Sequence, residues 1–206
     1  MFPAAAPPNV PMFEKTDLLD AIAPTNRGLL AAPEQKADIL SKVVCLEARN
    51  PTANPLAATE LLNGNWQLLY TTSTELLGID RFPLLGLGNI YQCVRIDQQR
   101  IYNLAEIKAA LGGLVSVTAT FEAVSDQRVN VRFDRAIFGL QSTLGYQNPD
   151  QFIQAMQQTS KFNLMRGIDF TVSSNREPGW LEVTYLDSTM RIGRGNQGSV
   201  FVLRKV

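Results

Sequence analysis

Residues 114–124 read LVSVTATFEAV, a run in which apolar side chains alternate with polar ones. Val115, Val117, Ala119 and Phe121 fall on one side of an extended chain, and the intervening Ser, Thr and Glu side chains fall on the other. A period of two over this length predicts a β-strand that buries one face and exposes the other to water.

The same period recurs on both sides of this run. The other predicted strands are residues 65–72, 90–96, 100–109, 129–134, 162–172, 180–186, 190–194 and 199–206. Short connections such as 97–99 and 125–127 predict antiparallel neighbours. About eight or nine such strands hide their edges by closing into an up-and-down β-barrel, whose interior is either filled by side chains or lines one small ligand.

The part of the chain before Asn63 shows a helical pattern. The predicted helices are 16–22, capped by Thr16; 33–49, beginning at Pro33 with a stripe of Ala37, Leu40, Val44 and Ala48; 56–62; and a short helix capped by Asn148 before the late strands. The fold class is therefore mainly β with α. We expect a flexible arm at residues 1–15 and one domain at 16–206, with a helical part at 16–62 and the barrel at 64–206.

Composition excludes several kinds of site. Lys plus Arg and Asp plus Glu both total 19, so the basic excess that nucleic-acid binding needs is missing. The chain has no histidine, which removes the commonest general base and transition-metal ligand, and we expect no metal and no cofactor. Cys45 and Cys93 match no metal spacing and are predicted to be buried thiols. The sequence contains no run of about 20 apolar residues, so it predicts no membrane-spanning helix.

Two blocks of sequence carry a family resemblance. Residues 63–73 read NGNWQLLYTTS, which contains the Gly-x-Trp that opens lipocalin-type barrels, and residues 190–203 read MRIGRGNQGSVFVL. Together they resemble the plastid-lipid-associated, or fibrillin, family over roughly residues 16–206. The resemblance implies a lipocalin-like barrel that binds, stores or transports a hydrophobic small molecule without catalysing a reaction. The implied ligands are prenylquinones, carotenoids or fatty acyl lipids.

The resemblance also implies a setting. Family members associate peripherally with thylakoid membranes or lipid bodies such as plastoglobules and support photoprotection. Residues 1–11 do not read as a transit peptide, so we expect a cyanobacterial protein, thylakoid-associated or cytoplasmic, rather than a mature plastid form. The alternative function is a scaffold with a filled barrel that binds an enzyme of quinone synthesis or a photosynthetic complex. An enzyme is the third choice, since no catalytic spacing is present.

Barrel closure is the first structural role we assign. In an up-and-down barrel the first and last strands pair, so Trp66 is predicted to pack beside a late arginine through a cation–π contact. Arg204 is the preferred partner, and Arg191 and Arg194 are the alternatives. Asn196 is expected in the tight turn between the last two strands. Contact of Arg191 or Arg194 with a lipid head group or a partner is the competing interpretation.

The predicted ligand-binding residues are those of the inward stripes together with a few polar groups for a head group. They are Tyr70, Val117, Ala119, Phe121, Val131, Phe133, Arg135, Leu164, Arg166, Ile168 and Tyr185. A buried guanidinium needs an acceptor, so Arg135 or Arg166 is expected to pair with Asp169, Glu182 or Asp187, or with the ligand.

One apolar loop follows the first strand at residues 76–89. Its large side chains are Leu77, Phe82, Leu84, Leu85 and Leu87. A long loop of this composition either plugs the mouth of the barrel or offers a surface to lipid.

Overall fold

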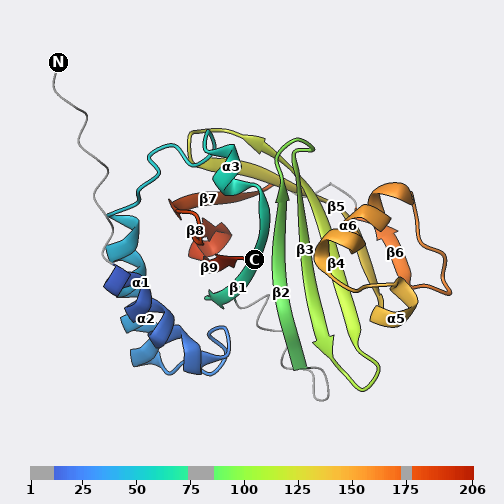
Figure 1. Ribbon diagram of the computed structural model, residues 1–206, viewed down its shortest axis with the longest axis horizontal. Coiled ribbons are helices and arrows are strands. Elements are labelled where there is room, and N and C mark those ends of the chain that lie inside the picture. The colour runs from blue at the N-terminus through green and yellow to red at the C-terminus, as the bar shows by residue number, and fades with distance from the viewer. Residues whose placement is uncertain (1–11, 74–85, 173–177) are drawn as a thin grey trace.

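The computed structural model describes residues 12–73, 86–172 and 178–206, and these form a β-barrel with helices on two sides (Figure 1). The strands are β1 (Gly64–Thr71), β2 (Gly86–Arg95), β3 (Arg100–Lys108), β4 (Gly113–Ala123), β5 (Arg128–Leu140), β6 (Ile168–Thr171), β7 (Gly179–Leu186), β8 (Met190–Gly195) and β9 (Val200–Lys205). The helices are α1 (Met12–Ile22), η1 (Ala23–Thr25), α2 (Pro33–Glu47), α3 (Thr59–Leu62), α5 (Gln141–Leu144), α6 (Pro149–Gln158) and η3 (Asn196–Gly198).

The strands follow the order β4-β3-β2-β1-β9-β8-β7-β5-β6, and an additional β4–β5 pairing closes eight of them into a ring. All the strand pairs are antiparallel, and most neighbours in the ring are neighbours in the sequence. The predicted lipocalin-like antiparallel barrel is therefore confirmed. Closure pairs β1 with β9, so the Gly-x-Trp strand does meet the last strand.

The ninth strand, β6, lies outside the ring and pairs with the part of β5 that does not pair with β7. β5 pairs with β7 over Arg128–Val131, and its later half pairs instead with β6 over Arg135–Phe138. Among the described residues β6 pairs with no other strand. The strand predicted over 162–172 was too long, because residues 164–166 form a turn that ends the extended chain before Ile168.

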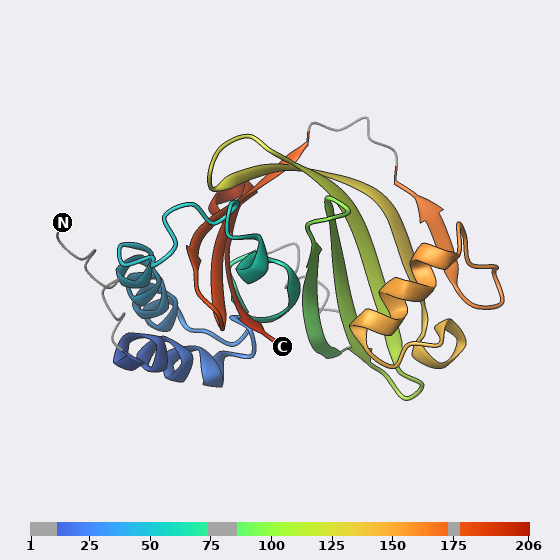
Figure 2. The same ribbon diagram turned by 45° about the horizontal axis from the view of Figure 1, so that its top comes forward.

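Two helical layers cover opposite outer faces of the barrel (Figure 2). α1 and α2 pack on the strands β1, β7, β8 and β9, and α5 and α6 pack on β2 to β5. The stripe predicted for α2 was wrong: Ile39, Val43 and Leu46 are buried, whereas Val44 is exposed. Cys45 is also exposed on α2, contrary to prediction, and Cys93 is buried beneath α6.

Local sequence explains α6, which begins where it was predicted to begin. The side-chain oxygen of Asn148 accepts a hydrogen bond from the backbone N–H of Gln151, at 3.0 Å, and Pro149 takes the first helical position. Phe152, stacked on Phe162 with ring centroids 6.0 Å apart, anchors the helix to the barrel.

The short helix α3 closes one end of the barrel. Leu62 packs in a cluster with Trp66 and Leu203, which point inward from β1 and β9. The backbone N–H of Leu56 donates to the carbonyl of Asp126 in the β4–β5 turn, at 3.2 Å. The barrel is thus filled at this end.

Candidate ligand-binding face of the barrel

Trp66 is held inside the barrel wall by three contacts. Its Nε1–H donates to the carbonyl of Leu62 at 2.9 Å, and Arg191 Cζ lies 5.0 Å from the ring centroid. Lys205 Nζ lies 5.3 Å from the same centroid. Arg191 on β8 is therefore the arginine of the predicted cation–π contact.

The prediction that Arg204 is the cation–π partner of Trp66 was wrong. Lys205 is the residue of β9 that pairs with Trp66, so its neighbour Arg204 points to the outer surface. There its Nη2 donates to Gln67 Oε1 at 2.8 Å. The alternation of the last strand decides this, and it depends on the register of the β1–β9 pairing.

The other two residues assigned to closure tie neighbouring elements together. Arg194 makes two hydrogen bonds to the Glu47 carboxylate on α2, at 2.8 and 2.7 Å. Asn196 Oδ1 accepts from the backbone N–H of Trp180 at 2.7 Å, which fixes the turn after β8. Arg194, one of the alternative partners of Trp66, therefore binds α2 instead, whereas Asn196 lies in the turn between β8 and β9 where it was expected.

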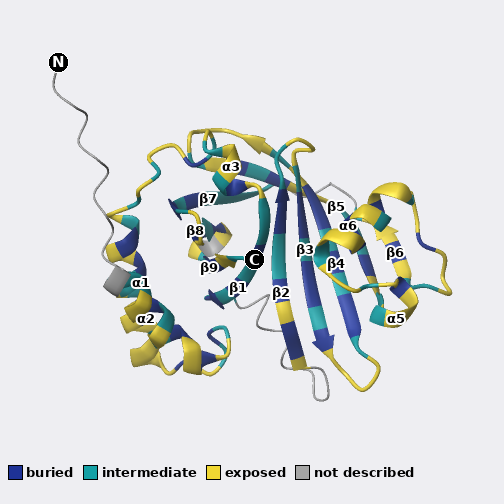
Figure 3. Ribbon diagram, viewed as in Figure 1, coloured by how far each residue is buried: buried dark blue, intermediate teal, exposed yellow. Residues whose placement is uncertain are grey.

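The inner face of the sheet changes from buried to exposed toward β6. One cross-strand row consists of Ile90, Ala105, Val115, Phe138 and Ile168, in the order β2 to β6. Ile90 and Ala105 are buried, Val115 is half-buried, and the side chains of Phe138 and Ile168 are 47% and 55% exposed. Figure 3 shows β6 among the exposed elements, beyond the more buried strands β2 to β4.

A set of apolar residues at the β4–β6 side therefore forms a surface that we call the open inner face. Its members are Val115, Val117, Phe133, Ala136, Phe138, Leu140, Ile168 and Phe170. It is open because β5 leaves β7 after Val131 and pairs with the edge strand β6, so no further described strand continues the wall there.

Six of the predicted lining residues do lie on inner faces. They are Val117, Ala119, Phe121, Val131, Phe133 and Ile168. Ala119 and Val131 are packed in a buried cluster with Phe121, whereas Phe133 and Ile168 belong to the open inner face. Contact of these residues with a ligand stays a prediction.

Three other predicted lining residues point outward, each because of a β-bulge. Register shifts lie between Leu68 and Tyr70, between Val183 and Tyr185, and in β5 opposite Thr118 and Ala119. One extra residue reverses the side to which the following side chains point. Tyr70 and Tyr185 consequently pack under α1 and α2, and Arg135 lies beneath α6.

The outward arginine Arg135 has an internal partner. Its Nε and Nη2 donate to the Asp169 carboxylate at 3.0 and 2.6 Å. Burial alone would raise the pKa of that carboxyl, but the bonds from Arg135 and from the Phe162 N–H lower it. The predicted pairing with Asp169 is confirmed, and Arg135 is not left for a ligand head group inside the barrel.

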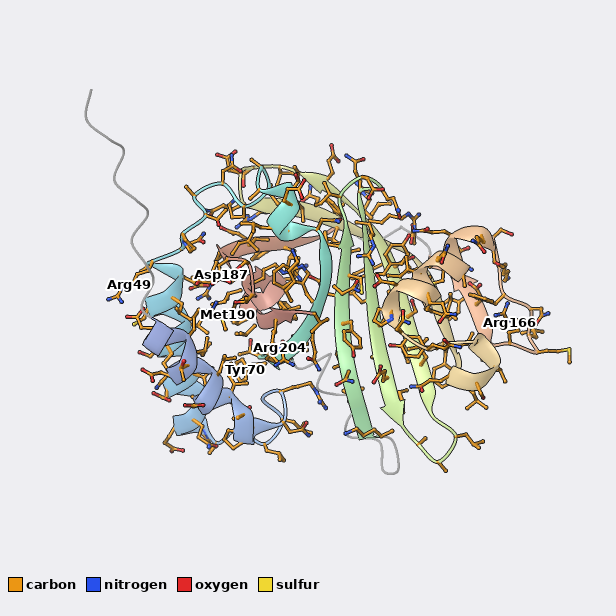
Figure 4. The ribbon with its side chains drawn as sticks, viewed as in Figure 1. Arg49, Tyr70, Arg166, Asp187, Met190 and Arg204 are labelled. Carbon is orange, nitrogen blue, oxygen red and sulfur yellow. The ribbon has the colours of Figure 1, made fainter. Side chains whose placement is uncertain are left out.

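Leu164 and Arg166 were wrongly assigned to the interior. Both lie in the turn before β6, and the Leu164 side chain is 87% exposed. Arg166 stacks on Phe162, with Cζ 4.7 Å from the ring centroid, and Nη2 donates to the carbonyl of Leu144 at 3.1 Å. Figure 4 shows Arg166 on the side of the barrel opposite to Tyr70.

Most of the apolar loop lies outside the described residues. This holds for Leu77, Phe82, Leu84 and Leu85. Leu87 is described, belongs to β2, and is buried in the cluster with Trp66.

Two surface pockets lie outside the barrel and are lined mainly by residues with polar groups. One, of about 370 Å³, lies beneath α6 and is lined by Arg100, Arg135 and Gln157 among others. Both arginines already pair with carboxylates, those of Asp134 and Asp169. The other, of about 340 Å³, is lined by Glu47 and Thr184 and lies between α2 and β7. Neither has the apolar character of the open inner face.

Sequence reasoning missed two polar residues on the inner face. Gln92 Nε2 donates to Asn103 Oδ1 at 3.2 Å, and Gln92 Oε1 accepts from Arg191. Gln92 lies two residues from each of the inward Ile90 and Val94 in β2, so the period of two places it on the same inner face, and that spacing was the available signal. Gln92 was not predicted to face inward because polar residues in a strand are ordinarily assigned to the solvent-exposed face.

Among the described residues, no helix is both long and apolar enough to span a bilayer, and no group of three acidic, Cys or His side chains is placed to hold a metal ion. No solved structure matches the chain.

Known sequences do match the chain over nearly its whole length. It is 31% identical to a probable plastid-lipid-associated protein 2 of Arabidopsis thaliana, over 93% of this chain and 70% of that protein. It is 32% identical to a light-induced chloroplast protein of Solanum tuberosum, over 98% of this chain and 70% of the relative. The identity is also 32% with a chromoplast-specific carotenoid-associated protein of Cucumis sativus, over 93% of this chain and 67% of the relative. The model of the PAP_fibrillin family matches residues 12–204, and the chain therefore belongs to that family.

Proposed function

We propose that this chain binds small hydrophobic molecules, of the carotenoid, prenylquinone or fatty acyl class, on the open inner face of its barrel. The observation that carries the proposal is the exposure of large apolar side chains there, notably Phe138 and Ile168. A soluble surface rarely gathers such side chains on one contiguous face unless the face has a binding role. The relatives named for plastid lipids and for carotenoids support this class of ligand.

The role is storage or transport, without catalysis, at the surface of a thylakoid membrane or lipid body, in support of photoprotection. Each methylene group removed from water gains about 0.8 kcal/mol, but a lipid tail gains nearly the same in a bilayer. The barrel thus stabilises a lipid tail about as much as the membrane does, and not much more. Modest affinity suits a carrier that both loads and unloads.

A scaffold for an enzyme or a photosynthetic complex is the second candidate. The observation that favours it is the filled end of the barrel, where Leu62, Trp66 and Leu203 leave the core packed. In that case the open inner face is covered by a protein partner, and small hydrophobic molecules do not bind saturably.

Titration of a short-chain plastoquinone analogue against tryptophan fluorescence tests the first candidate. The double variant Phe138→Ser/Ile168→Ser removes two exposed apolar side chains from the open inner face, and we expect its affinity to fall about tenfold or more. The matched control is Leu30→Ser/Val44→Ser, which removes two exposed apolar side chains elsewhere. Absence of saturable quenching in the parent chain, or equal loss in the control, would contradict the proposal.

A further inference from the structure

Arg191 is a buried cation without a described counter-ion. It lies on β8, paired with Leu203 of β9, and faces the barrel interior with 2% of its surface exposed. No Asp or Glu carboxylate in the ranges that the structure describes lies within 4.0 Å of the guanidinium. Arg135, which is partly buried and pairs with the buried Asp169, shows what is missing at Arg191.

This arrangement is unfavourable for the protein alone. Burial lowers the pKa of the Arg191 guanidinium to about 9, which leaves it protonated at neutral pH. Taking an unpaired cation out of water is costly, and only part of the cost is recovered from the Trp66 ring and one neutral acceptor. An anion bound next to the Arg191 guanidinium would offset the rest of this desolvation cost.

A polar path connects Arg191 to the open inner face. Arg191 Nη2 donates to Gln92 Oε1, Gln92 Nε2 donates to Asn103 Oδ1, and Asn103 Nδ2 donates to the carbonyl of Val117 at 3.3 Å. Gln92 and Asn103 are both half-buried, so the path is not sealed beneath the core.

The strand register extends this path into an apolar track. Gln92, Asn103, Val117, Ala136 and Phe170 lie on one cross-strand row, from β2 to β6. Four strand spacings of about 4.8 Å give a row of roughly 19 Å. The apolar part of this row, from Val117 to Phe170, covers two of these spacings, or roughly 10 Å. A cationic end, two polar amides and then an apolar track fit an amphiphile with an anionic head and a hydrocarbon tail.

We propose, building on the function proposed above, that the barrel selects amphiphiles with a carboxylate head, the carboxylate replacing Gln92 Oε1 as the acceptor for Arg191. The tail lies along Val117, Ala136 and Phe170. A carboxylate adds Coulomb attraction that a neutral amide oxygen does not supply, and its two oxygens can accept from the planar guanidinium together, which favours the exchange. Neutral carotenoids and quinones would use the same face without this anchor.

The variant Gln92→Glu tests the anchor without removing Arg191. It places a carboxylate of the protein where the ligand carboxylate would bind. The outer surface offers a matched control, because Gln67 Oε1 accepts from Arg204 in the same way. Gln67→Glu therefore makes the same chemical change next to an arginine outside the barrel.

The probes are a fluorescent polyene fatty acid and its methyl ester, titrated at about pH 8, where the acid is ionised and Arg191 is protonated. We expect the parent chain and Gln67→Glu to bind the acid at least about tenfold more tightly than the ester. Gln92→Glu should lose that preference while it keeps ester binding and melts at a higher temperature. Arg191→Lys, which keeps the charge but loses the planar fork, should reduce the preference in part.

Equal binding of acid and ester by the parent chain would overturn the anchor while leaving the proposed function intact. Equal loss of the preference in Gln67→Glu and Gln92→Glu would also overturn it. If the acid, the ester and the quinone analogue all failed to bind the parent chain, both proposals would be refuted.

Discussion

At the scale of single residues, Trp66 depends on its indole nitrogen as well as on its size. The Nε1–H satisfies the carbonyl of Leu62 at the end of α3, and the ring face meets Arg191. A phenyl ring keeps most of the apolar volume but leaves that buried carbonyl without a donor. Trp180 differs, because it stacks with the exposed Arg128, 4.4 Å from the ring centroid, at a half-buried position.

We therefore expect Trp66→Phe to lower the free energy of unfolding by about 1–3 kcal/mol. Trp180→Phe is the control and should cost at most about 1 kcal/mol, because an exposed cation–π contact is weak. Urea denaturation followed by circular dichroism measures both. Similar costs for the two variants would show that the Leu62 hydrogen bond does not stabilise the barrel.

At the scale of elements, the edge strand β6 is attached to the barrel mainly through Asp169. Its carboxylate accepts from Arg135 of β5 and from the backbone N–H of Phe162 at 2.7 Å. β6 is four residues long, and most of its other side chains are exposed. The outer side of β6 thus has a buried ion pair, while its inner side supplies Ile168 and Phe170 to the open inner face.

Asp169→Asn should cost about 3 kcal/mol, because it leaves Arg135 partly buried without a counter-charge. Hydrogen exchange of the β6 amides should accelerate more than that of β2 or β3. The control is Asp150→Asn, because the Asp150 carboxylate that pairs with Arg95 is 69% exposed, and this change should alter stability by at most about 1 kcal/mol. Unchanged exchange in β6 would mean that backbone pairing with β5 alone holds the strand.

At the scale of the whole molecule, Asp187 is one of the carboxylates that join the α1–α2 layer to the barrel, alongside Glu47. Asp187, in the β7–β8 turn, accepts from Lys15 Nζ of α1 at 2.5 Å and from the Tyr185 hydroxyl at 2.7 Å. Burial would raise the pKa of this carboxyl, but the bonds from Lys15, the Thr189 N–H and Tyr185 lower it to about 2. The same environment raises the pKa of the Tyr185 phenol, through burial and the bond to Asp187.

A depressed carboxyl pKa makes stability depend on pH in a fixed direction. The contribution of Asp187 is complete above its unfolded pKa of 3.8 and is lost as the pH falls toward about 2. We expect Asp187→Asn to be less stable than the parent chain at neutral pH and to lose less stability between about pH 5 and pH 2. Asp38→Asn, in an exposed pair with Lys42 on α2, is the control and should follow the parent curve. Parallel acid curves for the parent and Asp187→Asn would contradict this assignment.

The sequence by itself predicted the elements that local chemistry specifies. The alternation at residues 114–124 predicted β4, and Asn148 with Pro149 predicted the start of α6. The succession of short strands predicted the barrel, and the Gly-x-Trp block with the terminal block led to the family. Such signals are local, because a strand period or a helix cap is written in consecutive residues.

Only the tertiary structure decided which side chains meet inside the barrel. Each of three bulges adds one residue, and that residue moves Tyr70, Tyr185 and Arg135 from the inner face to the outer face. The register of the β1–β9 pairing turns Arg204 outward and leaves Arg191 of β8 against Trp66. A shift of one residue changes little in the local pattern but inverts a whole face, so pairing between distant strands, and not the period within each strand, determined the candidate site.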